Sequence, residues 1–459
     1  MEKFDLLICN GEVVSDSGVS QRDIGVREGK IAAFAPRLPQ HATQKIDAAD
    51  KLVFPGFIDA HTHMGIPIMN THSIDDFESG SVAAAFGGVT TIIDFTVQEK
   101  GQTLEESVEI RIQRARKCHV DYGLHVNVTD QPEQRLHEIP ELIGRGFTAF
   151  KVFSTYRQAG MMVTWDQFRK IVLQADAHDG LVCLHAEDND LVEALTADHL
   201  ATGCKAAIFH ARSRTAEAEA KAIARAAEIA GELGASLYIV HVSSRAGLEA
   251  GLQASRTRRD GVKIYLETCP QYLVLDEEMY RRENGHWWIT TPPLRTKEDC
   301  EALWQALADD QIDVVATDHC PFTMAQKDSA ERAFHLTPNG LPGVETLFPL
   351  LYTYGVTRGR ITLEQLVRVL AKNPAQIFGL YPKKGAIQVG ADADLVIWDP
   401  NAEQVITSKN LHGKADWSPY EGMTISGKLE HTILRGRFLV RDEHLVGNDV
   451  FGELLHAAR

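Results

Sequence analysis

Short, almost wholly apolar runs recur along the middle of the chain, which is the pattern of strands buried on both faces. They alternate with longer stretches rich in Ala, Glu, Leu and Arg, most plainly residues 215–234, whose composition and spacing predict helices. The predicted strands are Phe57–His63, Thr90–Phe95, Tyr122–Val128, Ala149–Phe153, Leu181–His185, Leu237–Val242, Lys263–Cys269 and Asp313–Asp318. This alternation predicts an α/β fold, a (β/α)8 TIM-like barrel with the helices outside.

The two ends of the chain have a different pattern of apolar and polar residues. Leu6 to Val14 and Asp23 to Phe34 predict β-strands, the second broken by a turn at Glu28-Gly29-Lys30. Strands return towards the C-terminus in Ala393–Trp398 and in a hairpin over His431–Val440. Strand-rich ends that flank a β/α middle predict a small β-sandwich domain formed by both termini.

The expected domain boundaries follow from these patterns. Residues 1–54 and 385–459 form the two parts of the sandwich, the second including a C-terminal tail, and residues 55–384 form the barrel. No internal repeat or low-complexity linker separates them, so we expect the domains to fold as one body.

Composition narrows the class of protein. A chain of 459 residues, 44% hydrophobic and 24% charged, can bury a large core. It shows no long apolar run and no basic, apolar leader, so the cytoplasm is expected, without a membrane span or signal peptide. The seven scattered cysteines favour neither disulfides nor a zinc–thiolate site, and a net charge of −16 disfavours nucleic acid and anionic membranes as partners.

Residue types that bind metals end five of the predicted strands. They are His61, His63, Lys151, His185, His241 and Asp318. The carboxyl ends of barrel strands meet at one face, and side chains alternate along a strand, so both histidines of His61-Thr62-His63 face the same way. An isolated buried histidine is more often a hydrogen-bonded core residue, but the complete set favours a site for two divalent metal ions.

Lys151 fits such a site only if its charge is removed. A buried ammonium would be costly and would repel two cations. Carboxylation by carbon dioxide converts the amine to a carbamate, an anion that can bind one metal through each oxygen. A salt bridge to a nearby carboxylate is the simpler interpretation for this residue alone, whereas the surrounding ligands favour N6-carboxylysine at Lys151.

This ligand set predicts a hydrolase. Two ions lower the pKa of a water molecule that they share from about 15.7 to near 7 and polarise a carbonyl group. We therefore expect a bridging hydroxide to attack an amide. Asp318, bound to one metal, is expected to take the proton and pass it to the departing nitrogen.

Several longer motifs resemble a known family. They are Glu267-Thr268-Cys269-Pro270-Gln271-Tyr272-Leu273, Pro292-Pro293-Leu294-Arg295, Thr317–Phe322, Pro338-Asn339-Gly340 and Phe378–Gly385. With the ligands, they resemble the dihydropyrimidinase and hydantoinase family of the amidohydrolase superfamily over essentially the whole chain. The resemblance implies a homotetramer with two ions, usually zinc, that opens 5,6-dihydropyrimidines or 5-substituted hydantoins, which are cyclic ureides, to N-carbamoyl amino acids.

The resemblance also implies individual roles. The more buried metal is held by His61, His63, Lys151 and Asp318, and the other by Lys151, His185 and His241. Tyr156 donates its hydroxyl to the oxyanion, although a packing tyrosine is the simpler alternative. Thr291, where the family usually has Ser, and Asn339 hold the ring; Asn339-Gly340 is also a common turn.

The segment after the histidine pair bears on the substrate. Dihydroorotases carry an Arg two positions after His-x-His, whereas this chain has Met64-Gly65-Ile66-Pro67. Met64, Ile66 and Phe153 resemble the family's contacts with the group at carbon five, so we expect tolerance for apolar or aromatic substituents. Two alternatives remain: an allantoinase, although its kin usually carry His in place of Gln271, and a non-catalytic scaffold like the collapsin-response mediator proteins, which have lost metal ligands.

Overall fold

The computed structural model describes residues 3–256, 262–329, 331–447 and 450–458. Its centre is an eight-stranded parallel sheet in the order β17-β16-β15-β14-β13-β12-β11-β8. These strands are β8 (Phe57–Thr62), β11 (Val89–Phe95), β12 (Asp121–Asn127), β13 (Ala149–Phe153), β14 (Leu181–His185), β15 (Leu237–Ile239), β16 (Ile264–Thr268) and β17 (Val314–Val315). All eight lie where the sequence predicts them, and the order follows the chain.

The first and last strands come together just beyond β17. A parallel bridge joins Thr62 to His319, and the His63 amide donates to the His319 carbonyl at 2.8 Å. Thr317 strengthens this junction because its amide and hydroxyl donate to the Asp59 carboxylate at 3.0 and 2.5 Å. The sheet therefore closes into the predicted barrel, with the start of the Thr317-Asp318-His319 motif anchored on β8.

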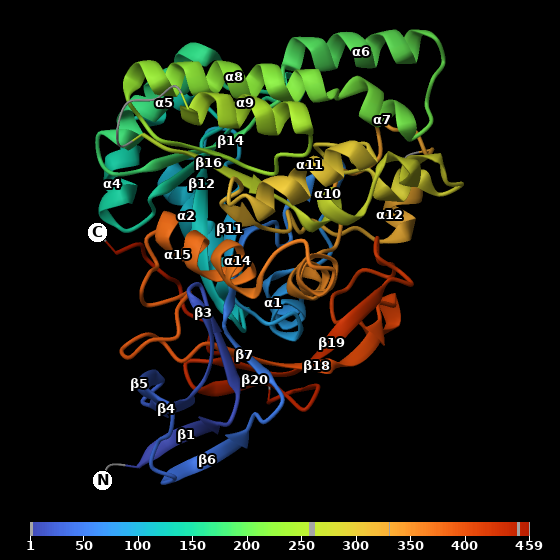
Figure 1. The fold of residues 1–459 in the computed structure, drawn as a ribbon. Helices are drawn as coiled ribbons and strands as arrows, with labels where there is room; N and C mark the ends of the chain where they lie inside the picture. Colours follow the sequence, from blue (N-terminus) through green and yellow to red (C-terminus); the bar gives the residue numbers. More distant parts are fainter. Residues whose placement is uncertain (1–2, 257–261, 330, 448–449, 459) are drawn as a thin grey trace.

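Helices surround the barrel in the upper part of Figure 1. The longer ones are α1 (Phe77–Phe86), α2 (Leu104–Arg114), α5 (Trp165–Asp176), α6 (Asn189–Ala201), α8 (Ala216–Leu233), α9 (Arg245–Arg256) and α11 (Lys297–Ala308). The shorter ones are α3 (Pro132–Arg135), α4 (Glu138–Gly144), α7 (Ile208–Ser213), α10 (Pro270–Val274), α12 (Met324–Asp328), α13 (Leu347–Leu351), α14 (Leu363–Val367) and α15 (Asn373–Ile377). The predicted helix over 215–234 is α8: the Thr215 side chain caps its start, and Gly234, at φ +71°, ends it.

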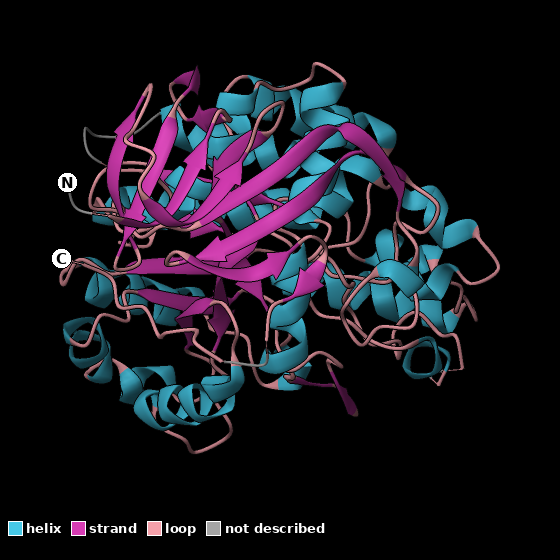
Figure 2. Ribbon diagram, turned by 90° about the horizontal axis from the view of Figure 1, so that it is seen from below, coloured by secondary structure: helices cyan, strands magenta, loops and turns pink. Residues whose placement is uncertain are grey.

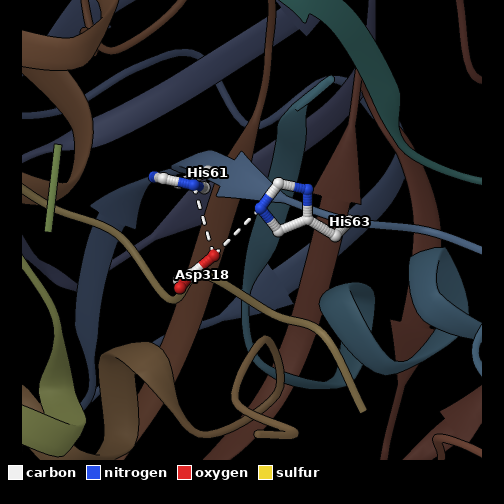
Figure 3. A group of neighbouring side chains, drawn as sticks. All are labelled: His61, His63 and Asp318. Atoms are coloured by element: carbon white, nitrogen blue, oxygen red, sulfur yellow. Dashed lines mark ion pairs between the residues drawn. The ribbon is translucent and has the colours of Figure 1, made fainter. Parts of the chain in front are cut away.

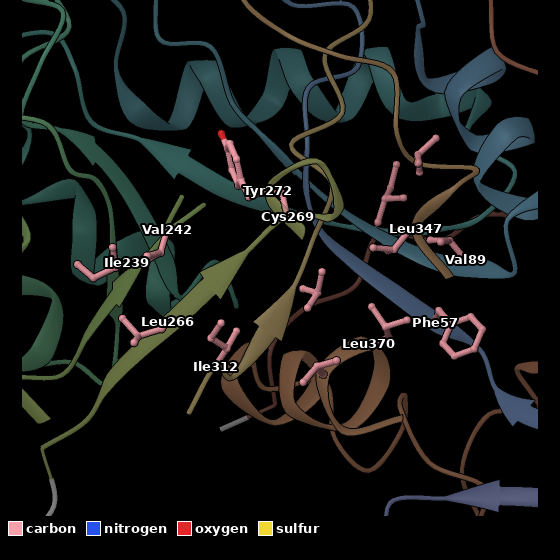
Figure 4. Packing of buried hydrophobic residues seen from close by; sticks show 14 of the residues in the cluster. Phe57, Val89, Ile239, Val242, Leu266, Cys269, Tyr272, Ile312, Leu347 and Leu370 are labelled. Atoms are coloured by element: carbon pink, nitrogen blue, oxygen red, sulfur yellow. The ribbon is translucent and has the colours of Figure 1, made fainter. Parts of the chain in front are cut away.

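The main core lies between the strands and these helices. Phe57 and Val89, near the starts of β8 and β11, and Leu347 of α13 are fully buried beside one another (Figure 4). The Phe57 ring stacks on Phe348, with centroids 4.3 Å apart. Burying one such side chain contributes about 1.5–3 kcal/mol, so this layer fixes the strands on which the site is built.

A second, strand-rich domain occupies the opposite end of the molecule, facing the viewer in Figure 2. One sheet, in the order β5-β4-β1-β6, contains β1 (Phe4–Cys9), β4 (Asp23–Arg27), β5 (Lys30–Ala35) and β6 (Ala42–Asp47). The other, in the order β21-β20-β19-β18-β7-β2-β3, contains β2 (Glu12–Ser15), β3 (Gly18–Gln21), β7 (Leu52–Pro55), β18 (Leu395–Val405), β19 (Thr424–Leu434), β20 (Arg437–Arg441) and β21 (His444–Leu445).

The pairing of β7 with β18 joins the two ends of the chain in one sheet. Ile8 and Ile24 of one sheet share a buried cluster with Leu395 and Ile433 of the other, so the two sheets form a sandwich, as predicted. One detail differs. The predicted strand Leu6 to Val14 is two strands, β1 and β2, because Asn10, at φ +65°, turns the chain between them.

The C-terminal tail returns to the barrel. The Tyr122 amide donates to the Glu453 carbonyl at 2.9 Å, and the Leu455 amide donates to the Tyr122 carbonyl at 2.7 Å. Leu455 is buried in a cluster with Ile93 and Phe378. The tail therefore covers the end of the barrel at which the strands begin, opposite to the end that carries the predicted ligands.

Candidate metal centre

Three of the predicted ligands converge at the carboxyl end of the barrel (Figure 3). The Nε2 atoms of His61 and His63 lie 3.2 and 3.0 Å from Oδ1 of Asp318. Ligand atoms on a tetrahedral zinc ion, each about 2.0–2.2 Å from the metal, are roughly 3.3 Å apart. The three donors are therefore already spaced to share one ion.

The backbone bends sharply where several of these side chains are presented. His241 and Asp318 have φ values of +39° and +53°, and Tyr156 has +67°. This left-handed region is uncommon for residues other than Gly, and such outliers cluster at functional sites. The bends also explain one difference from prediction: β15 ends at Ile239 and β17 at Val315, so His241 and Asp318 follow their strands instead of ending them.

Glu267 hydrogen-bonds His61 and two neighbouring groups. Its Oε1 lies 2.7 Å from Nδ1 of His61 and accepts the His241 amide at 2.9 Å, while Oε2 accepts the Tyr238 hydroxyl at 2.8 Å. A proton on Nδ1 of His61 leaves the lone pair of Nε2 directed at the site. Burial lowers the pKa of His61 well below 6.5, so its ring is neutral at pH 7 and able to bind a metal.

His185 is oriented through its other nitrogen. Its Nε2 lies 2.7 Å from Oε2 of Glu187, which also pairs with Arg214, so Nδ1 is left free for a metal. Burial opposes ionisation of Glu187, but Arg214 lowers its pKa to about 2. The ring centroids of His185 and His241 lie 4.5 Å apart. Nδ1 of His241 has no hydrogen-bond partner among the described residues.

Lys151 lies between the two groups of ligands. The side chain is 1% exposed, and its Nζ lies 5.0 and 5.3 Å from the ring centroids of Phe95 and Phe153. No carboxylate among the described residues forms a salt bridge with it, which disfavours the ion-pair interpretation. Burial lowers the pKa of the amine to about 8. A buried amine that is readily deprotonated and unpaired has the properties that carboxylation requires.

A cavity of about 300 Å³ opens above these residues. The structure brings to it all six predicted ligands (His61, His63, Lys151, His185, His241 and Asp318) and the predicted substrate contacts Phe153, Tyr156, Thr291 and Asn339. Apolar side chains form much of the remaining wall: Ile66, Pro67, Ile68, Met69, Phe95, Val97, Ala159 and Met161. One predicted contact, Met64, does not line it.

Met64 points into the core instead. It is 1% exposed, and its sulfur occupies the space beside Gly80 of α1, where a Cβ atom would lie only 2.2 Å from it. Side chains alternate along the backbone, so Met64 follows Thr62 outwards while His61 and His63 face the cavity. Ile66 takes the place on the cavity wall that Met64 was expected to share.

Tyr156 projects into the cavity beside the ligands. Its ring centroid lies 5.2 Å from that of His185, and the Arg214 guanidinium lies 5.0 Å from the tyrosine ring. Burial raises the pKa of the Tyr156 hydroxyl well above 10, so it remains protonated and able to donate a hydrogen bond at neutral pH. This is the property that an oxyanion-stabilising group needs.

Residues 52–439 match the Amidohydrolase family. The chain belongs to this family. Two curated relatives, both D-hydantoinases, are 39% identical (Geobacillus stearothermophilus, covering 99% of this chain and 96% of the relative) and 40% identical (Ralstonia pickettii, 98% of each). The crystal structure of dihydropyrimidinase from Brevibacillus agri NCHU1002 superposes with a TM-score of 0.95 at 36% identity over all of both chains. This amidohydrolase therefore shares its whole architecture with these proteins.

The positioning residues were largely missed by the sequence analysis. Glu267 was noted only as part of a motif, and Glu187 and Arg214 were not assigned roles. Glu187 follows His185 by two residues, so strand alternation was a usable signal. Arg214 lies between α7 and α8 and reaches this amidohydrolase's site only through tertiary packing.

Proposed function

We propose that this chain is a metal-dependent hydrolase of cyclic amides that opens 5,6-dihydropyrimidines, 5-substituted hydantoins or both to N-carbamoyl amino acids. The observation that carries the proposal is that all six predicted metal ligands, including the buried Lys151, line one cavity with an apolar wall. The relatives named D-hydantoinase and dihydropyrimidinase support this substrate class.

The set of ligands fits two divalent ions, which we propose to be zinc. His61, His63 and Asp318 would hold one, His185 and His241 the other, and the carbamate formed on Lys151 would join both. When bound, such ions supply an activated water and polarise the substrate carbonyl. Asp318 lies at the cavity with its carboxylate ionised: burial opposes ionisation, but the adjacent His61 and His63 lower the pKa of Asp318 below its usual value. It can therefore accept a proton at Oδ and return it to the leaving nitrogen.

The rest of the cavity would hold the ring. Tyr156 donates to the carbonyl oxygen as negative charge develops on it, and the segments around Thr291 and Asn339 offer polar backbone groups to the ring. Thr291 is held by His210, whose Nε2 lies 2.8 Å from the Thr290 carbonyl and 3.3 Å from Oγ1 of Thr291. Ile66 and Phe153 offer an apolar surface to the substituent at carbon five.

The proposal also covers the setting of the enzyme. The family resemblance favours a homotetramer, and the composition favours the cytoplasm. Among the described residues no helix is long and apolar enough to cross a membrane. The small cyclic ureide is the expected partner, with no role for nucleic acid.

One hydrolysis panel tests the proposal. Metal-replete protein is assayed with dihydrouracil, both enantiomers of phenylhydantoin and methylthioethylhydantoin, allantoin and dihydroorotate, and its metal content is measured. We expect ring opening of dihydrouracil or the hydantoins and two ions per chain. No turnover of dihydrouracil or phenylhydantoin would contradict the proposal. Turnover of allantoin alone would identify an allantoinase, and less than one ion per chain would favour a non-catalytic scaffold.

A further inference from the structure

The short helix α12 lies beside the cavity without lining it. Three of its consecutive residues, Gln326, Lys327 and Asp328, hydrogen-bond neighbouring segments. Two of these contacts reach segments that carry cavity residues: the hairpin of β9 (Pro67–Ile68) and β10 (Thr71–His72), and the backbone next to Thr290 and Asn339.

Gln326 uses both ends of its side-chain amide. Its Oε1 accepts the Thr323 amide at 2.8 Å, which completes a capping box at the start of α12. Its Nε2 donates to Oγ1 of Thr71 at 2.7 Å and to the His72 carbonyl at 2.9 Å. Among the described residues, Gln326 is the only side chain outside the hairpin that hydrogen-bonds β10.

That hairpin forms the apolar wall for the substituent. Ile66, Pro67, Ile68 and Met69 line the cavity, yet Met69 is 53% exposed. The base of the hairpin is fixed because the Ser73 amide donates to the Ile66 carbonyl at 2.9 Å. Further out, β10 pairs with β9 and is bonded from outside the hairpin by Gln326.

Lys327 bonds the backbone next to two other residues of the cavity lining. It is fully buried, and its Nζ donates to the Ile289 carbonyl at 2.8 Å and to the Pro338 carbonyl at 2.7 Å. These carbonyls come directly before the cavity residues Thr290 and Asn339. The Gly340 amide also donates to the Ile289 carbonyl at 3.0 Å, so the two ring-binding segments are joined at this point.

Asp328 secures the helix itself. Its Oδ1 lies 2.6 Å from Nε2 of His286 and accepts Nε1 of Trp287 at 3.1 Å. Both partners belong to the turn that leads into Ile289. The helix is thus fixed on the ring-binding side and reaches across to the hairpin through Gln326.

We propose that Gln326 and Lys327 are positioning residues with separate roles in specificity: Gln326 sets the wall that receives the substituent at carbon five, and Lys327 sets the backbone that receives the ring. This inference rests on the proposed cyclic-ureide substrate. It predicts that selectivity among substituents and affinity for the ring can be changed independently from adjacent positions of one helix.

The variant Gln326→Glu separates the two functions of the amide. The carboxylate still accepts the Thr323 amide, but it cannot donate to β10 and faces the His72 carbonyl with an oxygen. The Thr71 hydroxyl can turn to donate to the new carboxylate, but the bond to the His72 carbonyl is replaced by repulsion between two oxygens. We therefore expect kcat/KM for phenylhydantoin, relative to unsubstituted hydantoin, to fall about tenfold through KM. Gln167→Glu is the matched control, because Gln167 forms the same capping box with Thr164 in α5 and makes no described contact with the hairpin.

The variant Lys327→Met removes the donor and keeps most of the volume. We expect KM for hydantoin and phenylhydantoin to rise by the same factor, about tenfold, with their ratio unchanged. Metal content and the urea midpoint are measured for every variant. If the Lys327→Met protein fails to fold, the Gln326→Glu variant, whose helix cap is intact, provides the test.

Hydrogen exchange supplies a readout that needs no substrate. Gln326→Glu should speed exchange of amides in 66–73 only, and Lys327→Met should speed it in 289–291 and 338–340. The inference is overturned if Gln326→Glu behaves like Gln167→Glu, or if it changes both substrates equally. Failure of the wild-type protein to hydrolyse any cyclic ureide would instead refute the proposed function, and the exchange pattern would still decide whether the two tethers act separately.

Discussion

Nδ1 of His61 lies 2.7 Å from Oε1 of Glu267, so a fully buried carboxyl group sets the orientation of a predicted metal ligand. Replacing Glu267 with Gln keeps the size and one acceptor oxygen but removes the negative charge that favours a proton on Nδ1 and strengthens the hydrogen bond to it. We expect metal affinity to fall about 10- to 100-fold, which is typical when such a partner is lost. Metal retention during titration with a chelator measures the effect.

Tyr238→Phe is the control for this prediction. It removes the hydroxyl that donates to Oε2 of Glu267 and leaves the contact with His61 intact. Its loss of metal affinity should be clearly smaller than that of Glu267→Gln. Equal affinity of Glu267→Gln and the wild-type protein would show that the charge of Glu267 does not contribute to metal binding by His61.

Lys151 gives a prediction that depends on pH. Carbon dioxide reacts with a neutral amine, and burial lowers the pKa of this amine to about 8. In the metal-free protein, carboxylation should therefore speed up about tenfold per pH unit below pH 8 and level off above it. Recovery of activity after adding zinc and bicarbonate measures the rate, with the bicarbonate concentration adjusted at each pH so that dissolved carbon dioxide stays constant.

Lys151→Ala tests the same group by removal. The variant should lose turnover and bind less metal, and formate or acetate, which can occupy the vacated space, should restore part of both. Lys170→Ala, at an exposed lysine paired with Glu133, is the control and should behave as wild type. Undiminished turnover by Lys151→Ala would rule out a bridging carbamate.

Tyr156→Phe removes one hydroxyl from the cavity. The ring should keep its place beside His185 and Arg214, while the donor to the oxyanion is lost. We expect kcat to fall about 10²- to 10³-fold with little change in KM or metal content. Because burial raises the pKa of this tyrosine above 10, its ionisation should not limit the wild-type rate below pH 10. An unchanged kcat would leave Tyr156 with a packing role only.

The barrel, and the meeting of six candidate ligands at one cavity, were predictable because their signals are local. Each strand is a short apolar run, and each ligand stands near the end of one, as Lys151 and His185 do. The parts that were not predictable depend on distant contacts. Arg214 reaches Glu187 only through packing, and the tail meets Tyr122 across more than 300 residues of sequence. The prediction that Met64 lines the cavity was wrong because it followed the family resemblance. The alternation of side chains along the strand points Met64 away from the face that carries His63.

Ile66→Ala and Met64→Ala form a matched pair that tests this correction. Ile66 lines the cavity, so its truncation should lower selectivity for phenylhydantoin over hydantoin by about 10-fold, as expected for lost apolar contacts. Met64→Ala should leave selectivity unchanged and reduce the free energy of unfolding by about 2–5 kcal/mol, because it opens a hole beside Gly80. The reverse result would show that Met64, and not Ile66, contacts the substituent.

Lys384 joins the barrel to the sandwich through buried charges. Its Nζ lies 2.5 Å from Oδ2 of Asp121, 3.0 Å from Asp392 and 2.8 Å from Asp394. Burial opposes the charge on Lys384, but these carboxylates raise its pKa above 10.5. Its contribution to stability is therefore complete below pH 10.5 and is lost only as the pH rises through the folded-state pKa.

Lys384→Met should lower the free energy of unfolding at pH 7 by about 3–5 kcal/mol, because three buried carboxylates lose their shared cation. The deficit should shrink as the pH falls from 7 towards 4, since the unpaired carboxylates then take up protons on folding. Urea unfolding at several pH values measures it. Lys30→Met removes a half-exposed partner of Asp392 and should cost at most about 1 kcal/mol. A deficit that stays constant with pH would show that the carboxylates do not need Lys384 to remain ionised.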